Sequence, residues 1–258
     1  GLQEIWIYGG KTLELAAGRD NTLSARLTEH PNSPGEVTAV HPEGIGSIEV
    51  VSGETVRLAN PDNDITGKAT IADGAKLVVA SSGALGGGSS DEGKLYGYVS
   101  NVWTESGTLQ LGDANATVVE QAIGTIHVGT EGSINLQEGS QLTIAGFENA
   151  GNRSLADNKI LGHINGADDT GLIITGGTEL LVSTDDNVTD KTSSFLTTVT
   201  GDSTLTLGNS KSLGTGVIKL TGTNDGGKTR LRVRATSTLR ATVMRSSSRM
   251  RGRRSQVR

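Results

Sequence analysis

A short strand-and-turn unit recurs along most of this chain, and it restricts the folds that the chain can adopt. The unit reads Gly, then Ser or Thr, then aliphatic residues two positions apart, and it occurs three times in succession over residues 124–144. Looser copies begin at Gly177, Gly201 and Gly214. Aliphatic residues with period two indicate strands with one buried side, and a single unit is too short to bury that side alone. The sequence therefore predicts stacked coils of short strands, which is an all-β solenoid.

The spacing of the units predicts three-sided coils of about 22 residues, so that residues 1–227 would form roughly ten coils. An antiparallel β-sandwich is the alternative, because it also alternates short strands with turns. Aromatic residues make up only 3% of the chain. This scarcity favours flat aliphatic layers over a sandwich core that contains large aromatic side chains.

Three stretches interrupt the repeated pattern. Gly9-Gly10 separates two alternating segments near the start and is typical of either a hairpin-like turn or a turn within a coil. The stretch from Thr28 to Glu43 holds three of the four prolines, and we interpret it as a loop or an excursion from the stack. Residues 86–91 read Gly-Gly-Gly-Ser-Ser-Asp, which predicts a flexible break.

The charge of the chain changes at residue 228. Residues 228–258 hold 11 of the 23 Lys and Arg residues and no acidic residue. Residues 1–227 therefore hold 12 basic and 28 acidic residues, a net charge of −16. We assign 1–227 to the rod and 228–258 to a basic tail, which we expect to be disordered because like charges repel and little apolar surface can be buried. The tail is either a non-native, out-of-frame end or an arm that binds nucleic acid.

Composition also restricts the chemistry that is open to the chain. There is no cysteine, so no disulfide or thiolate contributes to the fold or to a site. No stretch approaches the ~18 consecutive apolar residues of a membrane helix. The acidic rod disfavours direct binding to nucleic acid or to an anionic membrane.

The stretch from Leu58 to Gly86 resembles the passenger-associated repeat of bacterial autotransporters, the type V secretion proteins. The matching positions are Asn60, Asn63, Ile65, Thr66-Gly67, Ala69-Thr70-Ile71, Gly74, Leu77-Val78-Val79 and Ala84-Leu85-Gly86. Two positions depart from the repeat: Ile65 stands where an aromatic residue is usual, and Ala75-Lys76-Leu77 where Thr-Leu is usual. Residues 212–220 resemble the closing part of a second copy.

The resemblance implies a right-handed parallel β-helix of the AIDA-like adhesin type, exported through the outer membrane to the bacterial cell surface. Its expected role is structural: adhesion, autoaggregation or biofilm formation, with a host-cell surface or like passengers as partners and a link to virulence. It also implies a signal peptide and a C-terminal outer-membrane barrel; neither is in the sequence, so we expect a fragment. The family has no fixed catalytic residues, so we predict no enzyme activity, no cofactor and no catalytic or metal residue.

The alternative function is that of a β-helix polysaccharide lyase or hydrolase, which would need acidic residues beside a basic residue. Pairs of acidic residues occur at Asp168-Asp169 and at Asp185-Asp186, and Asp62 and Asp64 are separated by one residue. All three pairs lie beside turn residues, and we interpret them as solvated turn acids. Calcium at coil edges is possible in principle, but Gly86-Gly87-Gly88-Ser89-Ser90-Asp91 lacks the order of a calcium-binding roll.

Three further motifs bear on chemistry. Gly201-Asp202-Ser203 is similar to the nucleophile segment of a serine protease, but Thr204 replaces the usual Gly and none of His30, His41, His127 and His163 lies in a catalytic signature. We interpret Asp202-Ser203 as a turn that enters the Leu205/Leu207 strand. Gly10-Lys11-Thr12 lacks the earlier Gly of a phosphate-binding loop. Tyr96, Tyr98 and Trp103 form either a carbohydrate-contact patch or, as we favour, an insertion that packs its aromatic rings on the rod.

Overall fold

All regular structure in the described part of the chain is β-strand. The computed structural model describes residues 2–8, 10–16, 21–30, 46–86, 98–114, 118–146, 158–184, 193–209, 212–222, 228–234 and 243–245. Within these ranges every strand pairing is parallel. They also contain no helix long and apolar enough to cross a membrane.

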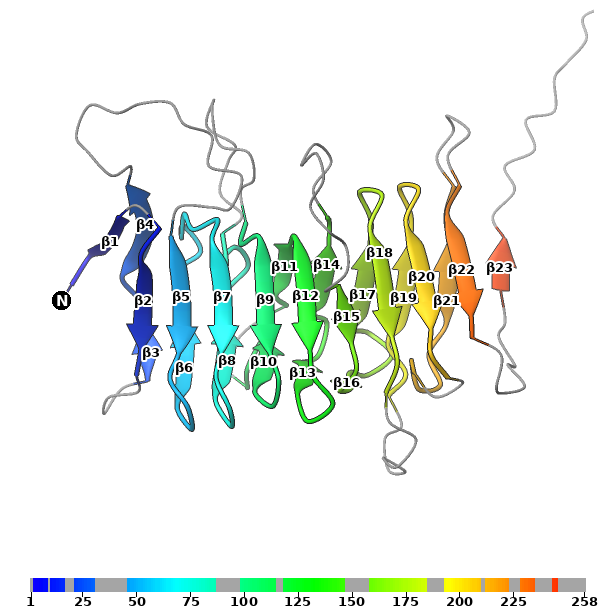
Figure 1. Ribbon diagram of the computed structural model, residues 1–258, viewed down its shortest axis with the longest axis horizontal. Coiled ribbons are helices and arrows are strands. Elements are labelled where there is room, and N and C mark those ends of the chain that lie inside the picture. Colours follow the sequence, from blue (N-terminus) through cyan, green and yellow to red (C-terminus); the bar gives the residue numbers. More distant parts are fainter. Residues whose placement is uncertain are drawn as a thin grey trace, which may run out of the picture.

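The strands stack along a rod on three faces, which the chain visits in the same order in each coil (Figure 1). Face 1 is a nine-stranded sheet of β2 (Thr12–Leu15), β5 (Ser47–Val50), β7 (Lys68–Ile71), β9 (Asn101–Thr104), β12 (Thr125–Val128), β15 (Lys159–Ile160), β18 (Glu179–Val182), β20 (Thr204–Leu207) and β22 (Arg230–Val233). Face 2 is a six-stranded sheet of β3 (Thr22–Leu23), β6 (Thr55–Leu58), β8 (Lys76–Val79), β10 (Thr108–Leu111), β13 (Ser133–Leu136) and β16 (His163–Asn165).

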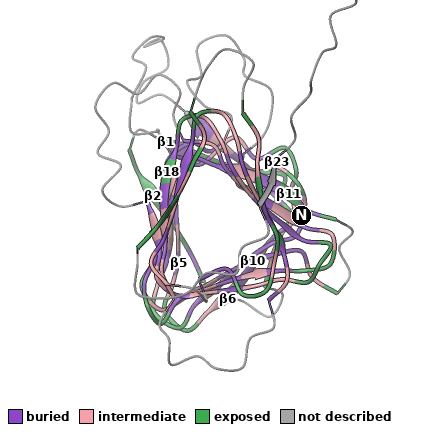
Figure 2. Cartoon of the chain, turned by 90° about the vertical axis from the view of Figure 1, so that its right-hand side faces the viewer, coloured by how far each residue is buried: buried purple, intermediate pink, exposed green. Residues whose placement is uncertain are grey.

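Face 3 begins with the two-stranded pair β1 (Glu4–Tyr8) and β4 (Arg26–His30). After two coils without a strand on this face, it continues as the six-stranded sheet of β11 (Glu120–Ile123), β14 (Gln141–Ile144), β17 (Gly171–Ile174), β19 (Leu196–Val199), β21 (Ile218–Leu220) and β23 (Val243–Arg245). Seen along the rod, the three faces enclose a triangular cross-section (Figure 2). The chain runs anticlockwise through faces 1, 2 and 3 as it approaches the viewer, which is a right-handed path. The fold is the predicted right-handed parallel β-helix.

The coil length agrees with the repeat in the sequence wherever no long insertion intervenes. Ile48 pairs with Ala69 in the following coil, and Lys159 pairs with Leu181 in the same way, so both coils have close to the predicted length. The nine strands of face 1 span eight intervals, which at ~4.8 Å per interval gives a sheet about 38 Å wide. Eight of these nine strands lie within residues 1–227, which is fewer than the roughly ten coils predicted for that range.

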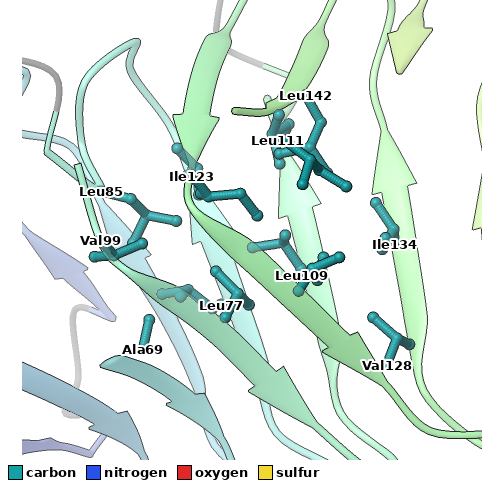
Figure 3. Packing of buried hydrophobic residues seen from close by; sticks show 14 of the residues in the cluster. Ala69, Leu77, Leu85, Val99, Leu109, Leu111, Ile123, Val128, Ile134 and Leu142 are labelled. Carbon is teal, nitrogen blue, oxygen red and sulfur yellow. The ribbon is translucent and has the colours of Figure 1, made fainter. Parts of the chain in front are cut away.

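The core consists of aliphatic columns, one residue per coil, that run along the inside of each face. On face 2 one such column contains Val56, Leu77, Leu109, Ile134 and Ile164, each at most 5% exposed. Figure 3 shows Leu77, Leu109 and Ile134 lying side by side, with Ile123 and Leu142 of face 3 opposite them. Because each strand contributes two inward side chains to two such columns, a short unit is stable only between its neighbours.

The corners are narrow because small residues stack there. The peptide N–H of Gly67 donates to the carbonyl oxygen of Gly46 in the preceding coil. A Cβ atom added to Gly67 would lie 2.2 Å from that oxygen, so no larger residue fits without moving the backbone. Thr66-Gly67 of the autotransporter-like stretch is therefore explained by close coil stacking.

Side-chain amides complete the ladder of face 3 where strands are missing. The buried Asn63 accepts a hydrogen bond from the N–H of Leu27 through Oδ1 and donates through Nδ2 to the carbonyl of Ala84, each at 2.8 Å. Gln121 makes the same kind of link, accepting from Leu85 N–H at 3.0 Å and donating to Gly86 O at 2.8 Å. An amide carries one acceptor and donors, so it can replace a peptide group between two coils.

The first coils correct one prediction and decide another. The segments on either side of residues 9–10 do not pair with each other: β1 pairs with β4 and β2 with β5, so a turn within a coil joins them. Thr28 and Glu29 belong to β4, so the loop predicted from Thr28 to Glu43 begins later than expected. The strand extends because β1 pairs with it along its whole length and Glu29 is held inside by hydrogen bonds. Residues 31–45 lie outside the described residues.

The described parts of the basic segment form strands. β22 pairs with β20 and β23 pairs with β21, both in parallel. Leu231 and Val233 continue the inner columns, whereas Arg230 and Arg232 lie on the outer side. These residues therefore differ from the expected disordered tail, because their period-two alternation fits the stack. Residues 235–242 and 246–258 lie outside the described residues, and the division of the chain at residue 228 stays a prediction.

The three longest undescribed segments that lie between described strands all join face 3 to face 1. Residues 31–45 precede β5, residues 87–97 precede β9, and residues 147–157 precede β15. These three strands are the second, fourth and sixth of face 1. The insertions therefore enter at one corner and on alternate coils.

Candidate functional site

The most distinctive side-chain cluster lies on the outer side of face 1. The indole of Trp103 is stacked on the imidazole of His127, with ring centroids 3.7 Å apart and planes inclined by 10°. The ammonium of Lys68 lies 4.5 Å from the centroid of the indole. Because β9 lies between β7 and β12, Lys68 and His127 approach the indole from opposite sides. We call these three residues the face 1 stack.

Strand register brings the face 1 stack together. Trp103 is paired with Thr70 in β7 and with His127 in β12, and His127 is paired with Lys159 in β15. All of these residues occupy the outward position of their strands, so their side chains project from one line along the rod. The outward column thus concentrates ring and cationic groups over a few coils.

A carboxylate and a buried imidazole complete the cluster. Nε2 of His127 lies 2.9 Å from Oε1 of Glu105, whose side chain is 60% exposed. The His127 side chain is only 5% exposed, and both ring nitrogens are buried. A substrate on the surface cannot reach either nitrogen in this arrangement, so the cluster is better suited to packing than to proton transfer.

The geometry also decides how Trp103 can contribute to binding. One indole face is covered by His127 and the other by Lys68, which is a stacking and cation–π arrangement. A sugar ring stacks on an open aromatic face, and Trp103 offers only its edge. Tyr98 packs on the rod, with its hydroxyl 3.4 Å from the carbonyl oxygen of Gly146. Both residues therefore agree with the favoured interpretation of rings packed on the rod; Tyr96 lies outside the described residues.

The acidic pairs do not converge across the rod. Asp62 and Asp64 follow β6, whereas Asp168 and Asp169 follow β16, and the two strands are four positions apart in face 2. Four strand spacings are about 19 Å, and the two carboxyl groups of a glycosidase lie within about 10 Å of each other. Asp185 and Asp186 lie outside the described residues. Among those that are described, no group of three or more His, Asp or Glu side chains could hold a metal ion.

Ser203 lies in a turn, as the sequence predicts. Gly201 and Asp202 have φ values of 58° and 63°, and β20 follows directly. Asp is one of the few residues that tolerate this left-handed conformation. The Ser203 side chain is fully buried, and its Oγ accepts a hydrogen bond from the N–H of Thr178 at 3.1 Å. A hydroxyl held in this way anchors two coils and is not available to a substrate.

A buried carboxylate that sequence analysis missed lies between the first coils. Glu29 is 9% exposed, and its Oε1 accepts hydrogen bonds from the N–H of Gly46 at 2.9 Å, of Gly67 at 3.3 Å and of Thr66. The hydroxyl of Thr66 donates to Oε2 at 2.9 Å. The sequence signal that could have found Glu29 is its position two residues after Leu27 in β4, because residues two apart in a strand point to the same side. The donors hold a negative charge in place, and they stabilise the corner of the coil.

The remaining candidate residues are dispersed. His163 is an outward residue of β16 on face 2, and His30 ends β4 on face 3. His41 lies outside the described residues. Lys11 lies in the turn between β1 and β2, and Gly10 beside it has a φ of 67°, as turns require. The structure does not bring these groups together with Ser203 into one described cluster.

The structure is a β-solenoid. In the side-chain clusters described above, the side chains pack on one another or form hydrogen bonds between coils. Comparison of the chain with protein-family models, curated proteins and solved structures finds no match. The resemblance to an autotransporter repeat is therefore carried by the residues of the chain, in the stretch from Leu58 to Gly86 and in the partial copy at residues 212–220.

Proposed function

We propose that this chain is part of a surface-displayed autotransporter passenger that acts by contact, in adhesion or in association with like passengers. The observation that carries the proposal is the set of outward polar side chains that bond from coil to coil. Oγ1 of Thr108 lies 2.9 Å from Oγ of Ser133 on face 2, and Nδ2 of Asn101 donates to Oγ1 of Thr125 at 2.7 Å on face 1. Such bonds hold polar groups in a flat, regular array.

A regular array favours many weak contacts over one deep site. Polar groups recur at each strand spacing of ~4.8 Å, which suits a ligand that is itself extended or repeated. Weak contacts that are made together give avidity far above that of each contact alone. The resemblance to the autotransporter repeat supplies the proposed location, on the bacterial cell surface.

Bead adhesion tests the proposal and identifies the face involved. Beads coated with the purified chain should bind cultured epithelial monolayers or aggregate with one another, whereas albumin-coated beads should not. Three variants each place two negative charges on one face: Asn101→Asp with Thr125→Asp, Asn135→Asp with Asn165→Asp, and Thr143→Asp with Thr198→Asp. One face variant should lose adhesion while its circular dichroism spectrum stays that of the parent. Adhesion no stronger than that of albumin refutes the proposal.

The same protein samples test the enzymatic alternative. Incubation with acidic and neutral polysaccharides should release no new reducing ends and no unsaturated uronic ends. Product formation that is lost in His127→Ala or Glu105→Ala would favour a lyase or hydrolase and would place the substituted residue in its active site. Product that is unchanged by both substitutions points to a contaminating enzyme.

A further inference from the structure

Face 2 carries a patch of polar side chains at mid-rod. The outward positions of three consecutive strands, β10, β13 and β16, form two columns in register. One column consists of side-chain amides, and the other holds two hydroxyls and an imidazole. The six residues, which we call the amide patch, are Thr108, Gln110, Ser133, Asn135, His163 and Asn165.

Hydrogen bonds hold these side chains in place. Oγ1 of Thr108 lies 2.9 Å from Oγ of Ser133, and Nδ2 of Asn165 donates to Oδ1 of Asn135 at 2.5 Å. Nε2 of Gln110 donates to the carbonyl oxygen of Gly112 in its own coil at 2.7 Å. Side-chain ladders of this kind keep a sheet flat. A ligand therefore meets groups that are already ordered, which lowers the entropy lost on binding.

The amide column keeps hydrogen-bonding capacity for a ligand. An amide side chain has two donor positions and an acceptor oxygen. The bond between the two asparagines uses the oxygen of Asn135 and one donor of Asn165. Among the described residues, no group bonds to Nδ2 of Asn135 or to Oδ1 of Asn165, and both side chains are partly exposed. A donor thus lies beside an acceptor, one strand spacing of ~4.8 Å away.

These groups are suited to the hydroxyls of a sugar chain. A hydroxyl both donates and accepts, so it can pair with the amide N–H of one coil and the amide oxygen of the next. The three strands span two intervals, about 10 Å along the rod, which a short stretch of polysaccharide can follow. Because the surface is flat, it contacts a straight chain over more of its length than a curved one.

The surrounding charge favours a neutral chain. Exposed acids border the amide patch at its corners: Glu131, Glu138, Asp168 and Asp169. Lys76 precedes Thr108 in its column and supplies one positive charge. The acids lie within a Debye length of ~8–10 Å of the strands that they border, so they would repel a polyanion.

The other two faces are less suited to a sugar chain over these coils. On face 1, His127 and Lys68 cover the two sides of Trp103. On face 3, the outward side chains of β11 and β17 include Ala122 and Ile173, which offer no hydrogen bonds.

We propose that the amide patch binds a neutral, extended polysaccharide of the cellulose type, which lies along the rod across β10, β13 and β16. The inference rests on the proposed function, because it names the ligand class of a contact surface. Each hydrogen bond is uncharged and weak, so one chain binds one rod weakly, and many displayed rods bind a polysaccharide surface by avidity.

Heteronuclear NMR on the isotope-labelled chain tests the proposal, because Asn and Gln side chains give their own amide signals. Cellohexaose at millimolar concentration should shift the side-chain signals of Asn135 and Asn165. Maltohexaose, which has the same sugar in a curved chain, should shift them much less. Polygalacturonate, which is anionic, should not shift them.

Two double variants locate the site. Asn135→Ala with Asn165→Ala should weaken the affinity for cellohexaose about tenfold, read from the backbone signals of β10 and β13, because two uncharged hydrogen bonds are lost. Thr70→Ala with Thr206→Ala removes two outward polar side chains from face 1 and should leave the affinity unchanged. Circular dichroism should show that both variants keep the β-fold.

Several results would overturn the inference. They are the absence of shifts with cellohexaose, equal shifts with maltohexaose, larger shifts with polygalacturonate, and parent affinity in the asparagine double variant. Shifts that grow with protein concentration in the absence of sugar would make the patch a contact between rods instead. Bead adhesion without cellohexaose shifts would refute this inference alone, whereas shifts without adhesion would refute the proposed function alone.

Discussion

Asn63→Ala tests whether a single amide holds the interrupted part of face 3 together. The side chain is 1% exposed and links Leu27 N–H to Ala84 O across three coils, with both distances 2.8 Å. Its removal leaves one buried donor and one buried acceptor without a partner. Each costs about 1–3 kcal/mol. We therefore expect the free energy of unfolding to fall by about 3–4 kcal/mol, toward the middle of the combined range.

The matched control is Asn60→Ala, three residues earlier in the same turn. Asn60 makes two hydrogen bonds as well, to Ser24 O at 3.0 Å and from Asp62 N–H at 2.8 Å, but both are exposed to water. Water replaces exposed partners, so the expected loss is below about 1 kcal/mol. Asn63→Asp should be worse than Asn63→Ala, because a carboxylate keeps the acceptor but places a buried charge against Ala84 O.

Guanidinium unfolding followed by circular dichroism measures the three costs, and hydrogen exchange locates them. Coils of a solenoid can unfold separately, so the loss of protection should centre on strands β4 and β8 and spare β17 and β18. Equal costs for the alanine variants at positions 60 and 63 would refute the role assigned to the amide. An equal loss of protection in β17 and β18 would refute its local character.

Three further predictions concern corners and rings. Gly67→Ala should lower the free energy of unfolding, measured in a thermal melt, by about 2–3 kcal/mol, because its Cβ would lie 2.2 Å from Gly46 O. Gly222→Ala, which has open space around it, should lower it by less than about 1 kcal/mol. Equal losses would contradict the close stacking. Glu29→Ala should cost about 3–5 kcal/mol, because it strands at least two buried N–H donors; retention of the parent melting temperature would contradict this. Acrylamide should quench the fluorescence of Trp6, measured in Trp103→Phe, far more than that of Trp103, measured in Trp6→Phe. The reason is that Trp6 is 52% exposed, whereas Trp103 is covered on both faces. Equal quenching would count against the face 1 stack.

The strands were predictable because each is specified locally. Every copy of the Gly-Ser/Thr-aliphatic unit singled out in the sequence coincides with a strand, from Thr125–Val128 to Ile218–Leu220. A glycine turn followed by residues of period two needs no distant information. Arg230–Val233 obeys the same alternation, but its dense positive charge directed the interpretation toward a disordered tail.

The clusters were not predictable because they depend on register between distant segments. Trp103 meets His127 only because their separation along the chain equals the length of that coil. The coil before it, which pairs Thr70 with Trp103, is longer because residues 87–97 are inserted. Neither composition nor local motifs reveal these differences in coil length, which decide which residues are neighbours in adjacent coils. Glu29 was missed for the same reason, since its donors come from residues 46, 66 and 67.

The alternate-coil spacing of the three insertions has a consequence for engineering. A segment that leaves a corner and returns to it occupies the width of about two strands, which is ~10 Å. Strands β5, β9 and β15 are each two positions apart in face 1, so segments attached before them start about 10 Å from one another along the rod. Attachment points for foreign peptides therefore recur at a fixed interval along one corner of the rod. Three such peptides could replace the segments between His30 and Gly46, between Gly86 and Tyr98, and between Gly146 and Asn158.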